Sequence, residues 1–225
     1  MRRRLATPLA ALTLALGSVA LTGCGDDDEP DATTTSAGEQ ADCVTVEQPP
    51  PKDEKFEKPG QALDPGEPAS ATVDTSCGSF VIELDTKRSP QTANSFAFLA
   101  EQGFYDDTIF HRIVPGFVIQ GGDPRGDGTG GPGYSIREPP PQRTTYRTGL
   151  VAMAKTGIEP PGTSGSQFFV VSAPADAGLP PDYAVLGEVS EGLDVVKTIG
   201  ALETDPSTEK PLEPVTIDSV TIDAG

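Results

Sequence analysis

Two polar side chains interrupt the most apolar part of the sequence. Arg112 and Gln120 stand among Ile, Val and Phe residues in two short segments that are joined at Pro115-Gly116. A guanidinium on an apolar sheet face costs free energy unless it is hydrogen-bonded or used. We therefore interpret Arg112 as a candidate functional residue, together with Gln167, which interrupts a second apolar segment.

Strand alternation predicts which side chains accompany these polar groups. Side chains two residues apart share one face of a strand. The first segment should therefore carry Phe110, Arg112 and Val114 on one face. The second segment should divide its side chains between two faces, one with Val118 and Gln120 and the other with Phe117 and Ile119.

The composition excludes several classes of function. The chain has 16 Lys and Arg against 34 Asp and Glu, a formal charge of −18, which argues against nucleic acid as a partner. The single histidine, His111, excludes a multi-histidine metal site, and we expect it to be a hydrogen-bonded core residue. Gly126 to Gly131 has dinucleotide-loop spacing, but Pro132 follows where a helix would begin. We expect no metal and no cofactor.

The N-terminus is typical of an export signal. Residues 1–23 begin with three arginines, continue through an apolar run and end at Thr22-Gly23 before Cys24. This end resembles the lipobox of bacterial lipoproteins, in which the cysteine is acylated. We therefore expect an extracytoplasmic protein that Cys24 anchors by lipid to the bacterial cell membrane. The alternatives are an uncleaved anchor and a secreted protein with a chance cysteine.

The next segment is polar and acidic, and we expect residues 24–66 to form a disordered tether before a folded domain over 67–225. Cys43 and Cys77 make an even pair in an oxidising compartment. A bridge between them would stabilise the domain by about 3–4 kcal/mol on the chain-entropy estimate. Two free thiols are the alternative.

The domain reads as short strands with two helices. Segments 70–76 and 79–84 flank a hairpin signal at Cys77-Gly78. Ser89, Pro90 and Gly103 mark the start and stop of a helix, and a second, shorter helix fits residues 192–199. About six further strands are expected, at residues 109–114, 117–120, 150–154, 167–172, 184–189 and 215–222. This pattern favours a mostly β fold, a closed antiparallel barrel.

Five blocks from residue 71 onward resemble cyclophilins, the cyclosporin-family peptidyl-prolyl isomerases. They are Phe110 to Phe117, Gln120 to Asp123, Gly128 to Gly131, Met153-Ala154 and Gly165 to Phe169, in the order of that family. The resemblance implies a closed eight-stranded antiparallel β-barrel capped by two α-helices, with the active groove on the outer face. It implies an isomerase of Xaa-Pro bonds whose partners are proline-containing polypeptides, here exported or envelope proteins, and we assume a monomer.

The resemblance also assigns residue roles. Arg112 would be the catalytic arginine and Gln120 would orient it. The remaining roles belong to residues that wall the proline pocket or line the groove: Phe117, Val118, Ala154, Lys155, Gln167, Phe169, Leu179 and Tyr183.

Some positions depart from the family pattern. Gly178 stands where many eukaryotic members have Trp, and Tyr183 stands where they have a pocket histidine. We therefore expect weak cyclosporin binding. The same changes keep a second interpretation open, that of a low-turnover proline-peptide binding or chaperone module.

Overall fold

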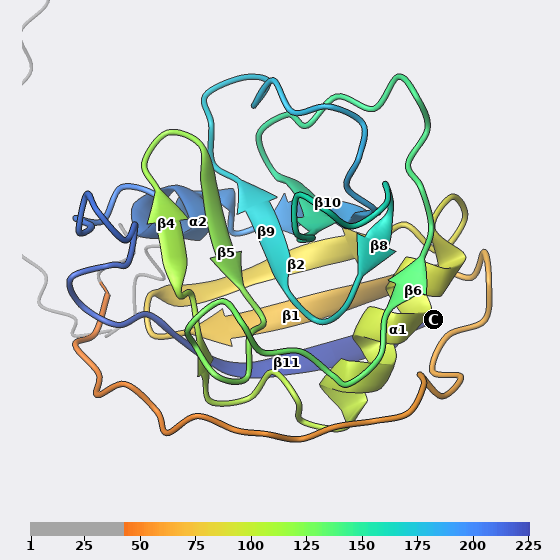
Figure 1. Ribbon diagram of the computed structural model, residues 1–225, viewed down its shortest axis with the longest axis horizontal. Helices are drawn as coiled ribbons and strands as arrows, with labels where there is room; N and C mark the ends of the chain where they lie inside the picture. The colour runs from red at the N-terminus through yellow and green to blue at the C-terminus, as the bar shows by residue number, and fades with distance from the viewer. Residues whose placement is uncertain (1–42) are drawn as a thin grey trace, which may run out of the picture. The chain divides into compact units, whose positions relative to one another are not determined.

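The computed structural model describes residues 43–225, so the predicted signal peptide, Cys24 and residues 24–42 lie outside the described residues. The described chain is mostly β with two helices (Figure 1). The helices are α1 (Pro90–Glu101) and α2 (Leu193–Ile199). The strands are β1 (Ala69–Thr75), β2 (Gly78–Leu84), β3 (Thr108–Ile109), β4 (Arg112–Val114), β5 (Val118–Gly121), β6 (Ile136–Arg137), β7 (Leu150–Met153), β8 (Thr163–Ser164), β9 (Phe168–Val171), β10 (Val185–Glu191) and β11 (Thr216–Ala224).

Nine of these strands form one antiparallel sheet in the order β3-β11-β1-β2-β10-β7-β9-β5-β4, and β6 pairs with β8 separately. The sheet curls, so that β1, β2 and β11 lie behind β4, β5 and β9 (Figure 1). The predicted closed barrel of eight strands is therefore corrected to a curled sheet of nine. Its two edge strands, β3 and β4, follow one another in the chain and are separated by Phe110 and His111, which belong to neither strand.

The concave side of the sheet holds the main core. Phe96 of α1 stacks on Tyr105 with ring centroids 4.8 Å apart and meets the edge of Phe168 of β9 at 5.6 Å. These rings exclude water from one face of β9. Because β5, β7 and β9 also carry a second apolar cluster on their other face, their central side chains are buried on both sides.

Both predicted helices are present. α1 starts after Ser89, with Pro90 in its first turn, and Gly103 follows its end with φ of 66°. The Ser89 side chain makes no capping bond; instead the Glu138 carboxylate accepts hydrogen bonds from the backbone N–H of Gln91 at 3.3 Å and of Thr92 at 2.8 Å. A carboxylate from a distant segment thus caps the helix, in keeping with its positive N-terminal end.

The first hairpin turns one residue earlier than predicted. β1 ends at Thr75, which pairs with Gly78, so Ser76 and Cys77 form the turn. Gly78 has φ of 109°, a conformation that favours glycine. Cys77 of this turn forms a disulfide with Cys43.

Residues 43–66, which we call the strap, differ from the expected disordered tether. The strap has no helix or strand, yet it runs along the domain beneath β11 and α1 (Figure 1). Phe56 meets Phe98 edge to face at 5.3 Å, and Leu63 is 7% exposed. The Asn94 side chain accepts hydrogen bonds from the backbone N–H of Ala62 and Leu63. Two apolar anchors, backbone hydrogen bonds and the disulfide together offset the ordering entropy of a segment poor in apolar residues.

We predict that removing the disulfide destabilises the domain. The variant Cys43→Ala/Cys77→Ala should lose about 2–4 kcal/mol of unfolding free energy, because the unfolded chain gains the freedom of the opened loop. Urea unfolding of the variant and of the wild type, with and without reductant, measures this loss. The reduced wild type should match the variant, and a wild-type midpoint that does not change with reductant would contradict the prediction.

Candidate active site

Three polar side chains on neighbouring strands form a row across the curled sheet. Arg112 of β4 is the register partner of Gln120 of β5, and Gln167 directly precedes β9. Gln120 Oε1 accepts a 3.4 Å hydrogen bond from Arg112 Nη1, and Gln120 Nε2 donates a 3.1 Å bond to Gln167 Oε1. The structure thus brings together the three polar residues singled out from the sequence, each with a hydrogen-bond partner.

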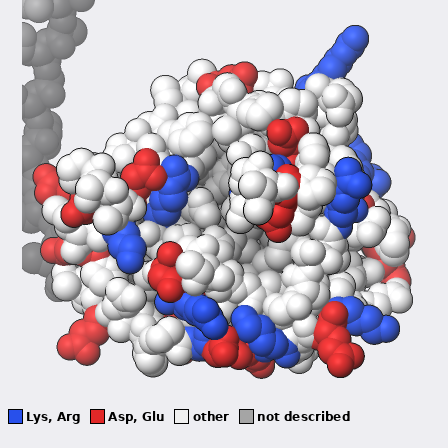
Figure 2. Space-filling model, in the orientation of Figure 1, with Lys and Arg blue, Asp and Glu red and all other residues white. Residues whose placement is uncertain are grey.

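Beside this row lies a pocket of about 150 Å³. Its walls come from β4, β5, β9, the turn before β5, the segment that follows β7 and the loop before β10. They include nine of the ten predicted site residues: Arg112, Phe117, Val118, Gln120, Ala154, Lys155, Phe169, Leu179 and Tyr183. Figure 2 shows a hollow of mostly uncharged atoms on this face, with charged side chains around it. An apolar floor with one guanidinium at its edge is suited to a small apolar ring attached to a polar chain.

Gln167 is the tenth predicted residue, and it stands behind the pocket wall. Its Nε2 donates to the backbone carbonyls of Gly128 at 3.0 Å and Gly130 at 2.9 Å. Gln167 therefore links the pocket's Gln120 to the loop that precedes β6.

Strand alternation predicted the wrong face for two apolar residues near Arg112 and Gln120. Phe110 does not share a face with Arg112, because its side chain packs in the main core 6.2 Å from Phe168. The chain leaves β3 before Phe110, which breaks the period of two. Phe117 does not accompany Ile119 into that core, because it precedes β5 and packs in the outer cluster at the pocket.

Tyr183 closes one end of the pocket and is fixed by a residue that the sequence analysis missed. The hydroxyl of buried Tyr146 donates to the Tyr183 carbonyl at 2.8 Å and accepts from its backbone N–H at 3.0 Å. Burial raises the pKa of Tyr146 to about 12, so this hydroxyl stays protonated. Tyr183 in turn meets Phe169 edge to face at 5.4 Å, and Lys155 Nζ lies 5.5 Å from its ring centre.

Glu209 is the second missed residue. Its Oε2 lies 2.5 Å from Arg112 Nε, and its backbone carbonyl accepts from the Ile113 N–H at 2.8 Å. Glu209 has φ of 58°, which is uncommon for a residue with a Cβ. Glu209 is 97 positions from Arg112 in the chain. No local sequence pattern could therefore have identified it as a partner of Arg112.

His111 adjoins Arg112 in the chain but does not line the pocket. It is buried, and its Nδ1 has no hydrogen-bond partner among residues 43–225, which corrects the expected fully bonded histidine. Burial is the main cause that lowers the pKa of His111, so the imidazole is neutral at pH 7.

A larger cavity of about 590 Å³ lies elsewhere, beside β1, β2 and β10. Two of its arginines are paired within it, Arg88 with Asp85 and Arg147 with Glu188. It contains none of the predicted site residues, so we place the candidate site in the smaller pocket.

Residues 43–225 contain no cluster of three or more His, Cys, Asp or Glu side chains that could hold a metal ion. In the same part of the chain, no helix is long and apolar enough to cross a membrane.

The comparisons with known proteins identify the family of the chain. Residues 70–222 match the family described as cyclophilin type peptidyl-prolyl cis-trans isomerase, and the chain belongs to that family. Peptidyl-prolyl cis-trans isomerase B of Streptomyces anulatus is 42% identical over 171 residues, which cover 68% of this chain and 95% of the relative. Peptidyl-prolyl cis-trans isomerase-like 1 of Bos taurus is 39% identical over 158 residues, 68% of this chain and 92% of the relative. The protein is thus a cyclophilin-type peptidyl-prolyl cis-trans isomerase.

Solved structures show the same fold. The crystal structure of a cyclophilin type peptidyl-prolyl cis-trans isomerase of Cryptosporidium parvum superposes with a TM-score of 0.63 at 30% identity, and it covers 70% of this chain and 99% of that one. A second structure of that protein, determined in the presence of the dipeptide Ala-Pro, gives a TM-score of 0.62.

We predict that Glu209 helps to orient Arg112. Glu209→Gln should lower kcat by about two- to five-fold, the amount expected from one partly exposed ion pair, with little change in KM. Exchange NMR on an Ala-Pro peptide measures both constants. Glu203→Gln is the matched control, because Glu203 is exposed and its carboxylate has no partner among residues 43–225. Equal activity of the wild type and Glu209→Gln would contradict the prediction.

Proposed function

We propose that this isomerase works by stabilising the twisted Xaa-Pro bond with Arg112, without a nucleophile, a proton transfer or a metal. Rotation of the planar bond costs about 18–20 kcal/mol, because amide resonance is lost as the bond twists. In the twisted state the prolyl nitrogen becomes pyramidal and regains a lone pair. A guanidinium N–H can donate a hydrogen bond to that lone pair only in this state, so it stabilises the transition state above the ground state.

The contacts of Arg112 support this role. Nε is held by Glu209 and Nη1 by Gln120, and no other partner of the guanidinium is found among residues 43–225. Its remaining N–H groups are thus available at the edge of the pocket. A donor that is oriented before the substrate binds costs little reorganisation during the reaction.

The apolar pocket supplies the second part of the mechanism. An uncatalysed step of tens of seconds that is brought to about a millisecond needs roughly 6–7 kcal/mol, whereas one charge-assisted hydrogen bond contributes about 1.5–3 kcal/mol. Phe117, Phe169 and Leu179 surround a space that accepts the proline ring. These side chains would hold the ring while the preceding residue rotates. They would also exclude the water that stabilises the planar amide. The relative determined with Ala-Pro supports an Xaa-Pro substrate.

Arg112→Ala tests the mechanism. We expect kcat to fall about 10- to 150-fold, the equivalent of one charge-assisted hydrogen bond, while peptide affinity changes little. Exchange NMR between the cis and trans forms of an Ala-Pro peptide, without a coupled protease, measures the rate. Arg143→Ala is the matched control, because Arg143 is exposed and lines the other cavity. Wild-type turnover in Arg112→Ala would refute the role of the arginine, and saturable binding without acceleration by the wild type would favour the binding-module interpretation.

We further propose that the enzyme is a lipoprotein whose clients are exported or envelope proteins. The support is the signal-like residues 1–23, the lipobox-like Leu21-Thr22-Gly23-Cys24 and the disulfide between Cys43 and Cys77, which suits an oxidising compartment. Two or more acyl chains on Cys24 would anchor the protein stably.

Anchoring depends on Cys24 in this proposal. In bacteria supplied with a clickable fatty acid, the wild type should carry the label and sediment with membranes, and Cys24→Ser should do neither. Gly25→Ser, next to the cysteine, is the control and should keep both properties. A wild type without label would overturn the proposal.

A further inference from the structure

The strap lies directly against the loop of residues 123–133, which we call the glycine loop. The backbone N–H of Lys52 donates to the Pro124 carbonyl at 2.7 Å, and the backbone N–H of Phe56 donates to the Pro132 carbonyl at 2.7 Å. The strap therefore holds the glycine loop near both of its ends.

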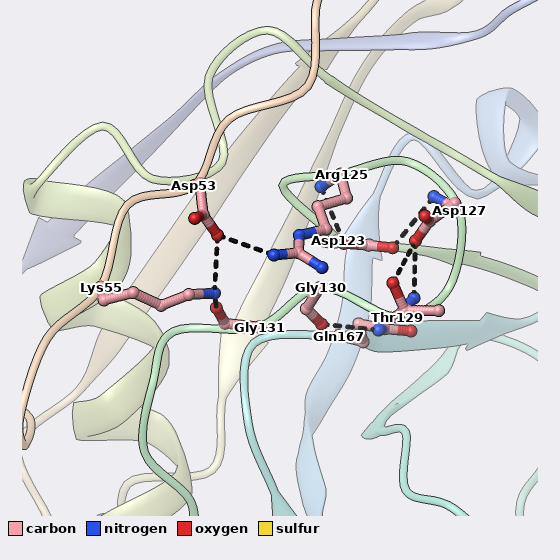
Figure 3. A network of polar contacts seen from close by, with 9 residues as sticks. All are labelled: Asp53, Lys55, Asp123, Arg125, Asp127, Thr129, Gly130, Gly131 and Gln167. Carbon is pink, nitrogen blue, oxygen red and sulfur yellow. Dashed lines mark hydrogen bonds and ion pairs between the residues drawn. The ribbon is translucent and has the colours of Figure 1, made fainter.

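Two strap side chains add contacts between these ends. Lys55 Nζ donates to the Gly131 carbonyl at 2.7 Å, and Asp53 Oδ1 accepts from Arg125 Nη2 at 3.0 Å (Figure 3). Asp53 and Lys55 also pair with each other at 3.4 Å. Figure 2 shows positive and negative side chains interspersed along the lower margin of this face, where the strap runs.

The glycine loop is folded around one buried carboxylate. Asp123 is fully buried and accepts hydrogen bonds from the backbone N–H groups of Arg125, Asp127 and Gly128 at 2.8, 3.1 and 2.5 Å. A Cβ at Gly130 would collide with this carboxylate. Because the loop is tightly folded, contacts on the side that faces the strap also restrain the carbonyls on its inner side, which faces Gln167.

Those inner carbonyls hold the polar row of the active site. Gln167 Nε2 donates hydrogen bonds to the Gly128 carbonyl and to the Gly130 carbonyl, the second of which is drawn in Figure 3. Gln167 Oε1 in turn accepts from Gln120. Gln120 meets Arg112. Polar contacts on both sides of the glycine loop, joined by the loop's own backbone, thus connect Asp53 and Lys55 to Arg112.

The strap has anchors of its own, so it can serve as a support. The disulfide fixes its first residue, Cys43, to the turn after β1, and Phe56 packs against Phe98 and Phe104. The family match begins at residue 70, so the strap lies outside the matched part of the chain.

We propose that Asp53 and Lys55 of the strap are positioning residues for the isomerase, acting through the glycine loop and Gln167 on Gln120 and Arg112. This inference rests on the proposed role of Arg112. The strap would then contribute to turnover as well as connecting the N-terminal region to the domain.

The test compares three strap variants and one active-site variant in the full chain. Asp53→Ala/Lys55→Met removes the two side-chain contacts with the glycine loop, and Asp53→Asn/Lys55→Arg keeps an acceptor and a donor at these positions. Glu54→Ala/Lys58→Met is the matched control, since both residues are exposed and their side chains have no partner among residues 43–225. Arg112→Ala serves as the reference for lost catalysis.

Two readouts are needed, because a structural role alone could change stability. Exposed ion pairs are weak, so we expect Asp53→Ala/Lys55→Met to lower kcat by about two- to five-fold with KM unchanged, at a temperature well below unfolding. The side-chain amide NMR signals of Gln120 and Gln167 should shift in the same variant. Asp53→Asn/Lys55→Arg should recover most of the wild-type kcat and most of the wild-type amide signals. Glu54→Ala/Lys58→Met should change neither kcat nor these signals.

The outcomes separate this inference from the mechanism on which it rests. If Arg112→Ala lowers kcat but the Asp53→Ala/Lys55→Met variant matches its control in kcat and in the two amide signals, the strap has no positioning role. If Arg112→Ala is fully active, the proposed mechanism fails. Unchanged amide signals of Gln120 and Gln167 in Asp53→Ala/Lys55→Met would separately show that the strap does not influence these two side chains. Altered stability with unchanged kcat and amide signals also overturns the inference.

Discussion

A guanidinium set on an apolar sheet face is the constraint on which this site depends. Arg112 lies beside Val118 and Phe169 in the pocket, with 34% of its side chain exposed. Hydrogen-bond partners lower the free-energy cost of placing its charge at the edge of an apolar cluster. Glu209 and Gln120 provide those partners, and Gln120 is fixed by Gln167, which is fixed by two glycine carbonyls. The contacts that lower the cost of the charge also orient the guanidinium, so in the proposed mechanism the same hydrogen bonds stabilise the site and prepare Arg112 for catalysis.

The curled sheet makes this arrangement possible. β5, β7 and β9 are buried on both faces, so the main core supports one side while the pocket forms on the other. Antiparallel register then places Arg112, Gln120 and Phe169 side by side on three successive strands. Residues on strands are held in place better than residues on loops, and the pocket takes Arg112, Val118, Gln120 and Phe169 from strands. In the loop before β10, the Tyr146 hydroxyl clamps the backbone of Tyr183.

The sequence predicted what depends on local pattern. The helix after Ser89, the paired strands around Pro115-Gly116 and the pocket residues follow from alternation, capping signals and the resemblance of short motifs. The failures have conformational or long-range causes. Phe110 and Phe117 lie where the chain leaves a strand, Glu209 reaches Arg112 through a left-handed backbone, and the strap is ordered by partners distant in the chain. A count of apolar residues in a short sequence window cannot detect strand ends, a left-handed backbone or partners that are distant in the chain.

In the proposed mechanism, Gln120 and Gln167 act as one unit on Arg112. A double-mutant cycle on kcat with Gln120→Leu, Gln167→Leu and the double variant measures this coupling directly. If Gln167 acts only by fixing Gln120, the double variant loses no more turnover than Gln120→Leu alone. Losses that multiply, with each variant folded and binding peptide, would show two independent effects and contradict the account.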